Sequence, residues 1–177
     1  MNLHLHIHPL IKTTWVVIFA LLMASCSSEH SDDASLKVAQ DFIAALEVRD
    51  ANQAIERLDE AAVLEVPYPL AAGENIYGSR KMWGEPLREY IHGIVQRNSR
   101  ISFNNSVWYT AGDGVIFLEC EGDLIRSKDG ARYQNKYIIL FKIEDSKIIL
   151  WREYYNPITA ATTFGIPLES IPTSISP

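Results

Sequence analysis

Four long strand-like segments follow one another toward the C-terminus, and their order constrains the fold more than any other feature. They span Ile101 to Tyr109, Val115 to Ile125, Ala131 to Ile143 and Lys147 to Tyr155. The connections between them are short and rich in glycine and aspartate, the residues that tight hairpin turns favour. The pattern predicts consecutive antiparallel strands, each long enough to bend around other elements.

Helical patterns dominate the part of the chain before this sheet. Residues 35–49 carry apolar side chains at spacings of three and four, as amphipathic helices do. Residues 51–58 predict a second helix with Asp50 as its N-cap, and a third begins near Pro86. Together the patterns predict an α+β fold, in which a curved, cone-shaped antiparallel sheet wraps around about three N-terminal helices.

The intervening residues predict one more strand and a loop. Residues 61–69 have strand composition and stop at two prolines, which cannot continue a hydrogen-bonded ladder. Residues 70–84 contain three glycines and indicate a loop.

The first 25 residues indicate export. The segment WVVIFALLMASC is a short apolar run followed by small residues and a cysteine, which is typical of a signal peptide and too short for a spanning helix of ~20 residues. The stretch Met23 to Cys26 resembles a bacterial lipobox, whose cysteine becomes the lipidated first residue. We therefore expect a signal peptide at 1–25, lipidation at Cys26, a polar tether at 26–34 and a folded domain at 35–177. A plainly cleaved signal or an uncleaved anchor is the alternative.

This organisation predicts a location and restricts the partners. A lipid anchor at Cys26 would hold the protein in the bacterial cell envelope, at the outer membrane and facing the periplasm. The net charge is −6 and no basic run is present, which argues against nucleic acid as a partner. With Cys26 lipidated, Cys120 is the one remaining cysteine, so neither an internal disulfide nor a zinc site is expected. We expect no metal and no cofactor.

Three stretches carry a resemblance to a known family. The order of elements, with FLECEGDLI, YQNKYIILFKIED and REYYNP in the sheet, resembles the nuclear transport factor 2-like superfamily in its SnoaL-like branch. The tail FGIPLESIPTS is similar to that of the phenazine biosynthesis A/B family. The resemblance implies a pocket inside the cone. The sequence departs from that family at its active-site histidine and serine, where Glu85 and Glu89 stand, and at an early arginine, where Gln53 stands.

Glu153 is the candidate catalytic residue. The resemblance implies this role, because Glu153 falls on the catalytic acid of the phenazine family. Its neighbours Trp151 and Tyr155 point to the same side of a strand. A carboxyl between them, away from water, would have a raised pKa suited to proton transfer near neutral pH. The alternative is an ion pair with Arg126 or Arg152.

Polar and aromatic residues on the strands and loops are candidate ligand-binding residues. The third long strand places Tyr133, Asn135 and Tyr137 on one face, which we expect to line the cone. Glu119 lies on the strand before it, opposite in direction to Cys120, which we expect to be a packing residue. The full predicted set is Tyr68, Trp83, Trp108, Glu119, Tyr133, Asn135, Tyr137 and Tyr155.

Three functions stay open on these grounds. The first is binding of a small apolar or aromatic molecule in the cone. The second is an isomerase-, cyclase- or dehydratase-like enzyme that uses Glu153 as acid and base. The third is a protein-interaction module. We also expect a homodimer formed through the sheet, because the last strand carries Ile149 and Trp151 on one face and Ile148 and Leu150 on the other, more apolar surface than one core absorbs.

Overall fold

The computed structural model describes residues 32–68 and 81–170 of the 177-residue chain. A helix over residues 32–47 comes first. The further elements are α2 Ala51–Glu56, β1 Leu58–Glu65, β2 Lys81–Trp83, α3 Gly84–Arg97, β3 Asn98–Thr110, β4 Val115–Arg126, β5 Arg132–Glu144, β6 Lys147–Tyr155, α4 Pro157–Phe164 and the short 3-10 helix Leu168–Ser170. The predicted signal peptide, Cys26, and the part of the tether before residue 32 lie outside the described residues.

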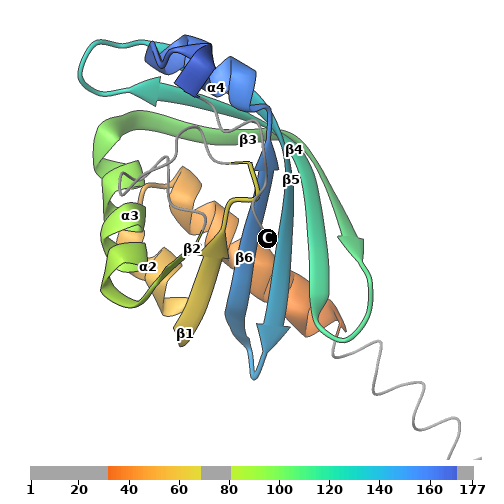
Figure 1. The fold of residues 1–177 in the computed structure, drawn as a ribbon. Helices are drawn as coiled ribbons and strands as arrows, with labels where there is room; N and C mark the ends of the chain where they lie inside the picture. The colour runs from red at the N-terminus through yellow and green to blue at the C-terminus, as the bar shows by residue number, and fades with distance from the viewer. Residues whose placement is uncertain (1–31, 69–80, 171–177) are drawn as a thin grey trace, which may run out of the picture.

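The six strands form one curved sheet in the order β2-β1-β6-β5-β4-β3. β1 pairs with β6 in parallel, and every other neighbouring pair is antiparallel. Figure 1 shows the long strands bending around the helices, with α4 across the upper end of the sheet. The predicted α+β class with a curved, unclosed sheet over helices is therefore confirmed. Within the described ranges, no helix is both long enough and apolar enough to cross a membrane.

The core lies between the first helix and the inner face of the sheet. On β5, Tyr137, Ile139 and Phe141 are buried, as the alternating pattern predicts. The Phe42 ring packs edge-on against Phe141 and Trp151, with ring centroids 5.8 and 4.9 Å apart. Each such buried side chain stabilises the fold by about 1.5 to 3 kcal/mol relative to an exposed one.

A β-bulge in β6 decides which side chains of the last strand face inward. Ile143 pairs with Ile148 while Lys142 pairs with Leu150, so Ile149 is the extra residue. The bulge places both Ile148 and Trp151 in the core, and the expectation that Ile149 and Trp151 share a face is wrong. Because side chains alternate beyond the bulge, Glu153 lies on the same inner face as Trp151.

Two elements were not predicted. Residues 81–83, expected in a loop, form β2 and pair with β1. Helix α4 begins after Asn156, whose side chain accepts hydrogen bonds from the backbone N–H groups of Ile158 and Thr159. It ends at Gly165, where φ is 67°, a left-handed conformation that favours glycine. This helix forms one wall of the site described next.

Candidate functional site

A cavity of about 160 Å³ opens between the inner face of the sheet, α3 and α4. Most side chains around it are apolar or aromatic, and the polar ones are few. The lining residues are Leu46, Tyr90, Ile94, Arg97, Asn98, Ile101, Phe103, Leu124, Arg126, Ala131, Tyr133, Tyr137, Trp151, Glu153, Tyr155, Ala160, Thr163 and Phe164. An apolar concavity with a few convergent polar groups has the composition of a small-molecule site.

Glu153 brings a carboxyl group to the wall of this cavity. It is half-buried because one side faces the cavity, although it lies deep within the protein. Among the described residues, no arginine or lysine forms an ion pair with it. Arg152 pairs with Glu65 at 2.5 Å and Arg126 pairs with Asp129 at 2.7 Å. The expected alternative, an ion pair between Glu153 and one of these arginines, is therefore wrong.

Burial controls the protonation of this carboxyl. It raises the pKa of Glu153 from 4.5 to about 7, because the charged form loses solvation. The indole N–H of Trp151 lowers the pKa of Glu153, but by less than burial raises it. That N–H is buried and has no hydrogen-bond partner of good geometry in the described part of the chain. Glu153 and Trp151 thus place an exchangeable proton and an indole donor side by side.

Two tyrosines add hydroxyl groups to the same cavity. The Tyr137 hydroxyl donates to the Tyr133 hydroxyl oxygen at 3.2 Å, and Asn135 Nδ2 donates to the same oxygen at 2.8 Å. Burial raises the pKa of Tyr137 well above 10, and Tyr133 and Glu153 raise it further. Tyr137 therefore stays protonated at neutral pH and remains a hydrogen-bond donor. Tyr155 lies against Tyr137 with ring centroids 6.0 Å apart.

Asn135, a predicted ligand-binding residue, is buried and does not line the cavity. Its Nδ2 donates to the backbone oxygen of Asn156 at 2.9 Å, and the Asn156 N–H donates to its Oδ1 at 3.1 Å. Asn156 is the N-cap of α4. Asn135 thus fixes the start of the helix whose residues Ala160 and Thr163 form a cavity wall.

Four other predicted ligand-binding residues lie away from the cavity. Glu119 is exposed on the outer face of the sheet, because it is one residue from the buried Cys120 on a pleated strand. Tyr68 and Glu119 both line a groove on this outer face. The ring centroid of Tyr68 lies 6.2 Å from that of Tyr154. Trp83 is 62% exposed, and Trp108 is half-buried against the core.

The residues at which the sequence departs from the phenazine family lie outside the cavity as well. Gln53, Glu85 and Glu89 are exposed. None of the three lines the cavity. In the described residues, no group of three or more histidine, cysteine, aspartate or glutamate side chains could hold a metal ion. Burial raises the pKa of the Cys120 thiol to about 12, so it is not a nucleophile at neutral pH.

The mouth and the α4 wall contain residues that the sequence did not predict to line the pocket, although Arg126 was considered as an ion-pair partner of Glu153. Arg97 and Arg126 line the mouth, and Phe164 packs on Tyr133 with ring centroids 4.9 Å apart. The sequence does contain a signal for helix α4, because Asn156-Pro157 is typical of a helix start and Gly165 of a helix end. No local signal marked the arginines, because α3 and β4 meet only in the folded chain.

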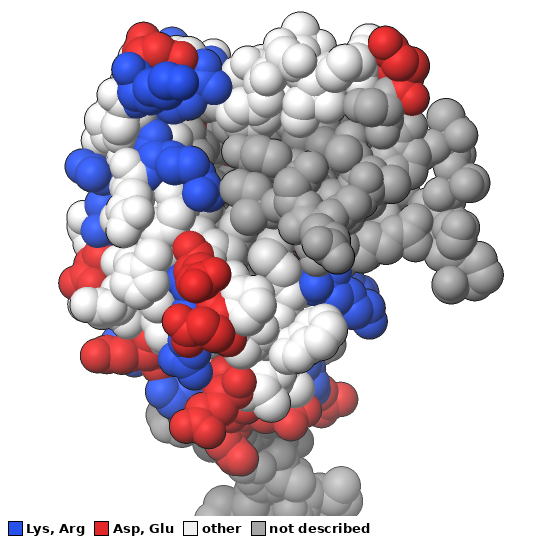
Figure 2. All heavy atoms as spheres, turned by 60° about the vertical axis from the view of Figure 1, so that its left-hand side comes forward, with Lys and Arg blue, Asp and Glu red and all other residues white. Residues whose placement is uncertain are grey.

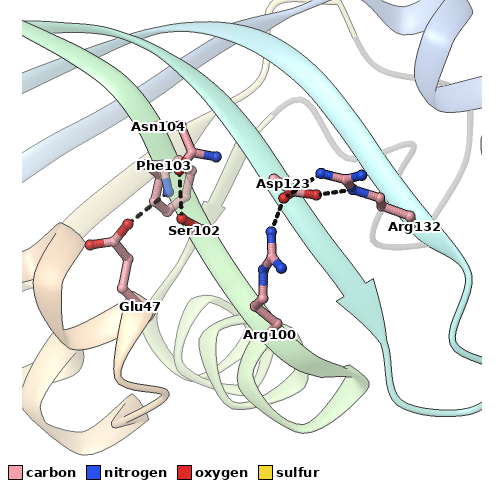
Figure 3. Close-up of polar contacts among 7 residues, drawn as sticks. All are labelled: Glu47, Arg100, Ser102, Phe103, Asn104, Asp123 and Arg132. Atoms are coloured by element: carbon pink, nitrogen blue, oxygen red, sulfur yellow. Dashed lines mark hydrogen bonds and ion pairs between the residues drawn. The ribbon is translucent and has the colours of Figure 1, made fainter.

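Polar contacts on β3, β4 and β5 hold these neighbouring strands together (Figure 3). Asp123 lies between two arginines, accepting from Arg132 Nε at 2.6 Å and also pairing with Arg100. Its side chain is only 2% exposed, and the arginines that cover it are about half exposed. On the first helix, Glu47 accepts a hydrogen bond from the Phe103 N–H at 2.7 Å. This contact fixes a strand residue that lines the cavity.

Comparison with known sequences finds two similar curated proteins, and no family model matches the chain. The uncharacterized protein YesE of Bacillus subtilis (strain 168) is 27% identical over 128 residues, which cover 70% of this chain and 82% of YesE. The uncharacterized PhzA/B-like protein PA3332 of Pseudomonas aeruginosa is 23% identical over 120 residues, covering 68% of this chain and 82% of that protein. The second relative supports the resemblance drawn from the sheet sequence.

Solved structures share the fold. A crystal structure of a Bacillus subtilis protein has a TM-score of 0.65 at 23% identity, covering 76% of this chain and 95% of that one. An NTF2-like protein from Burkholderia xenovorans LB400 has a TM-score of 0.56 at 16% identity, covering 75% and 96%. A phenazine biosynthesis-related protein from Pseudomonas aeruginosa has a TM-score of 0.55 at 18% identity, covering 80% and 91%. The fold is therefore nuclear transport factor 2-like.

Proposed function

We propose that this nuclear transport factor 2-like domain binds a small apolar or aromatic molecule in the cavity that Glu153 lines. One observation carries the proposal. The cavity is walled by aromatic side chains, yet it contains a carboxyl group without an ion-pair partner among the described residues, beside an indole N–H that makes no hydrogen bond of good geometry there. Buried polar groups are normally hydrogen-bonded, and leaving one unpaired costs about 1 to 3 kcal/mol. A ligand with a hydroxyl or carbonyl group would satisfy both.

The size of the cavity limits the ligand. About 160 Å³ is available, and a cavity of roughly 150 Å³ engineered in another protein accommodates benzene. One aromatic ring with a small polar substituent therefore fits without rearrangement. A protonated Glu153 could donate to an oxygen of the ligand and also accept from a hydroxyl group.

Phenol is a suitable first probe, because it combines one ring with one hydroxyl group. Binding would be followed by NMR through the indole N–H signal of Trp151, which lines the cavity. Thr163→Phe should block the cavity, since Thr163 lines it. Thr162→Phe is the matched control. Thr162 is exposed on the same helix, and both threonine hydroxyls donate to the carbonyl four residues earlier at 2.9 Å.

We expect phenol to shift the Trp151 signal in the wild type and in Thr162→Phe with similar dissociation constants. Thr163→Phe should weaken binding at least about tenfold, because the new ring occupies the ligand's space. An unchanged Trp151 signal at millimolar phenol, or equal binding by the two variants, would exclude this cavity as the binding site.

Proton-transfer catalysis by Glu153 is the second candidate function. It is favoured by the raised pKa of this carboxyl, about 7, because a general acid or base works best when its pKa is near the operating pH. The isomerase-, cyclase- or dehydratase-like chemistry considered above needs such a group. A general test is deuterium exchange into 4-phenyl-2-butanone next to its carbonyl group, where the Glu153 carboxylate would remove a proton and solvent deuterium would replace it. Exchange that is equally fast with Glu153→Gln would exclude this role.

We also propose that the chain is anchored through a lipidated Cys26 at the outer membrane, facing the periplasm. The apolar run and the small residues before Cys26 support this proposal. Mass spectrometry of the mature N-terminus should find a diacylglyceryl-cysteine. A Cys26→Ser chain that stays equally membrane-bound would contradict it.

A homodimer formed through the sheet is the proposed assembly. The register aligns Val107, Glu119, Ile138 and Tyr154 in one row across four strands of the outer face. Val107 is 46% exposed and Ile138 is 49% exposed. Apolar side chains exposed together on one face are typical of an interface. The same row would serve the alternative, a protein-interaction module, if a different protein covers it.

A further inference from the structure

The mouth of the cavity is built from two arginines on different elements. Arg97 is the last residue of α3 and Arg126 is the last residue of β4, and both line the cavity. Backbone contacts hold the two elements together, since the N–H of Ser127 donates to the carbonyl oxygen of Arg97 at 2.8 Å and its hydroxyl donates to that of Gln96 at 3.2 Å. The relative backbone positions of Arg97 and Arg126 are therefore fixed by the fold.

The two arginines differ in their ion pairs. Arg126 forms a two-pronged contact with Asp129, at 2.8 and 2.7 Å. Arg97 is exposed and forms no ion pair within residues 32–68 and 81–170. Its guanidinium lies over Gly93 on the same helix, where a Cβ atom would come within 2.4 Å of Nη1. The missing side chain of Gly93 thus leaves room for Arg97 to lie along the helix.

Positive charges gather at the ends of these two elements although the chain is acidic. Arg97 and the segment 126–131, which ends β4 and forms the following turn, contribute the cations Arg97, Arg126 and Lys128 against the one anion Asp129. Inside the cavity Glu153 adds one carboxyl group, and the whole chain has a net charge of −6. Figure 2 shows basic side chains gathered at the upper left, at the height of the β4–β5 turn in Figure 1, and most acidic ones toward the bottom.

We propose that the ligand of this cavity is a small organic anion, whose apolar or aromatic body lies inside and whose carboxylate or similar group binds Arg97 at the mouth. This inference rests on the proposed function, because it needs the cavity to bind a ligand. A guanidinium presents a planar set of N–H donors that matches a carboxylate. A cationic rim on an acidic protein also attracts anions to the opening over a distance of about one Debye length.

Matched acids and alcohols test this inference. The probes are benzoate, phenylacetate and 3-phenylpropanoate, each beside the alcohol of the same length, namely benzyl alcohol, 2-phenylethanol and 3-phenylpropanol. The series varies the distance between ring and charge, so one member should span from the cavity to Arg97. Affinities would be measured by NMR on the 177-residue chain.

The variants are Arg97→Gln and, as a control, Arg88→Gln. Arg88 lies nine residues earlier on α3, on the opposite face of the helix and about 13 Å away along its axis, and it does not line the cavity. The two substitutions change the net charge equally. A general effect of charge would therefore appear in both.

We expect the best acid to bind about fivefold to tenfold more tightly than its alcohol, and this preference to shrink between about 0.02 and about 0.5 M salt. Arg97→Gln should remove the preference without weakening the alcohol, and Arg88→Gln should keep it. Alcohols that bind as tightly as the acids, or a preference that survives in Arg97→Gln, would overturn the anion assignment while leaving the cavity a binding site. If neither acids nor alcohols bind, the proposed function fails, and this inference fails with it.

Discussion

The side-chain amide of Asn135 binds both backbone polar groups of Asn156. Its Nδ2 donates to the carbonyl oxygen at 2.9 Å, and its Oδ1 accepts from the N–H at 3.1 Å. The same Nδ2 donates to the Tyr133 hydroxyl at 2.8 Å. One buried residue on β5 therefore connects the start of α4 with a tyrosine of the cavity.

Replacing Asn135 should loosen α4 as well as lower stability. Asn135→Ala removes four hydrogen bonds and leaves the backbone groups of Asn156 without their partner, which should cost about 2 to 3 kcal/mol of unfolding free energy. Amide hydrogen exchange in α4 should speed up more than exchange in β5. Gln134→Ala, an exposed neighbour on the other face of the strand, should change neither. Unaltered exchange in α4 would contradict the role given to Asn135.

Asp123 should stabilise the protein in a pH-dependent way. The hydrogen bond from Arg132 is the largest cause that lowers its pKa, and the charge of Arg100 adds to it. For an acid whose pKa is lowered by folding, the stabilisation is complete above the unfolded pKa near 3.8 and is lost as the pH falls through the folded pKa.

Asp123→Asn should therefore be less stable than the wild type at neutral pH, and the difference should shrink below about pH 4. Asp129→Asn is the matched control, because Asp129 also forms a two-pronged contact with an arginine but is 44% exposed. Exposed ion pairs contribute little to stability. Urea unfolding across a pH series would measure both, and equal losses for the two variants would show that the burial of Asp123 has no effect.

The outer face of the sheet should mediate association. Ile138→Lys places a charge in the centre of the exposed row and should shift the chain from dimer toward monomer in light scattering at tens of micromolar. Ile158→Lys is the control, since Ile158 is 59% exposed on α4, away from the sheet. A wild-type chain that is already monomeric at that concentration would rule out the homodimer.

The inner face of β5 could be predicted from the sequence, whereas that of β6 could not. Strict alternation along Tyr133, Asn135 and Tyr137 marks one face of β5. In β6, four consecutive apolar residues hide the bulge at Ile149, because a shift by one residue leaves the apolar pattern unchanged. Glu153 was nevertheless assigned to the inner side, since it lies beyond the bulge in alternation with Trp151.

The composition of the cavity was predictable only in part. Tyr133, Tyr137 and Tyr155 belong to strands with a clear period and line the cavity as expected. Helix α4 was missed because its sequence PITAATTF contains β-branched residues that favour helices weakly. The place of Arg97 beside the cavity depends on a backbone contact with Ser127, which lies 30 residues later in the sequence. No local sequence pattern predicts such a contact.

Replacing Glu153 should change how stability depends on pH. Folding raises its pKa from 4.5 to about 7 through burial, so between these values the unfolded chain is ionised while the folded one keeps its proton. The unfolding free energy should therefore fall as the pH rises through this window, by about 3 kcal/mol in total. Glu153→Gln cannot ionise, so it should gain on the wild type from pH 5 to pH 8 in urea melts. A parallel dependence in both proteins would contradict the buried position.

The most direct measurement is a ¹³C NMR titration of the Glu153 carboxyl carbon, assigned by the loss of its signal in Glu153→Gln. We expect a pKa of about 7, because the carboxyl lines a water-poor cavity and no cation among the described residues pairs with it. Phenol in the cavity should shift this titration, since it would replace the remaining solvent around the carboxyl. A pKa near 4.5 that phenol leaves unchanged would show that Glu153 faces solvent and has no part in the site.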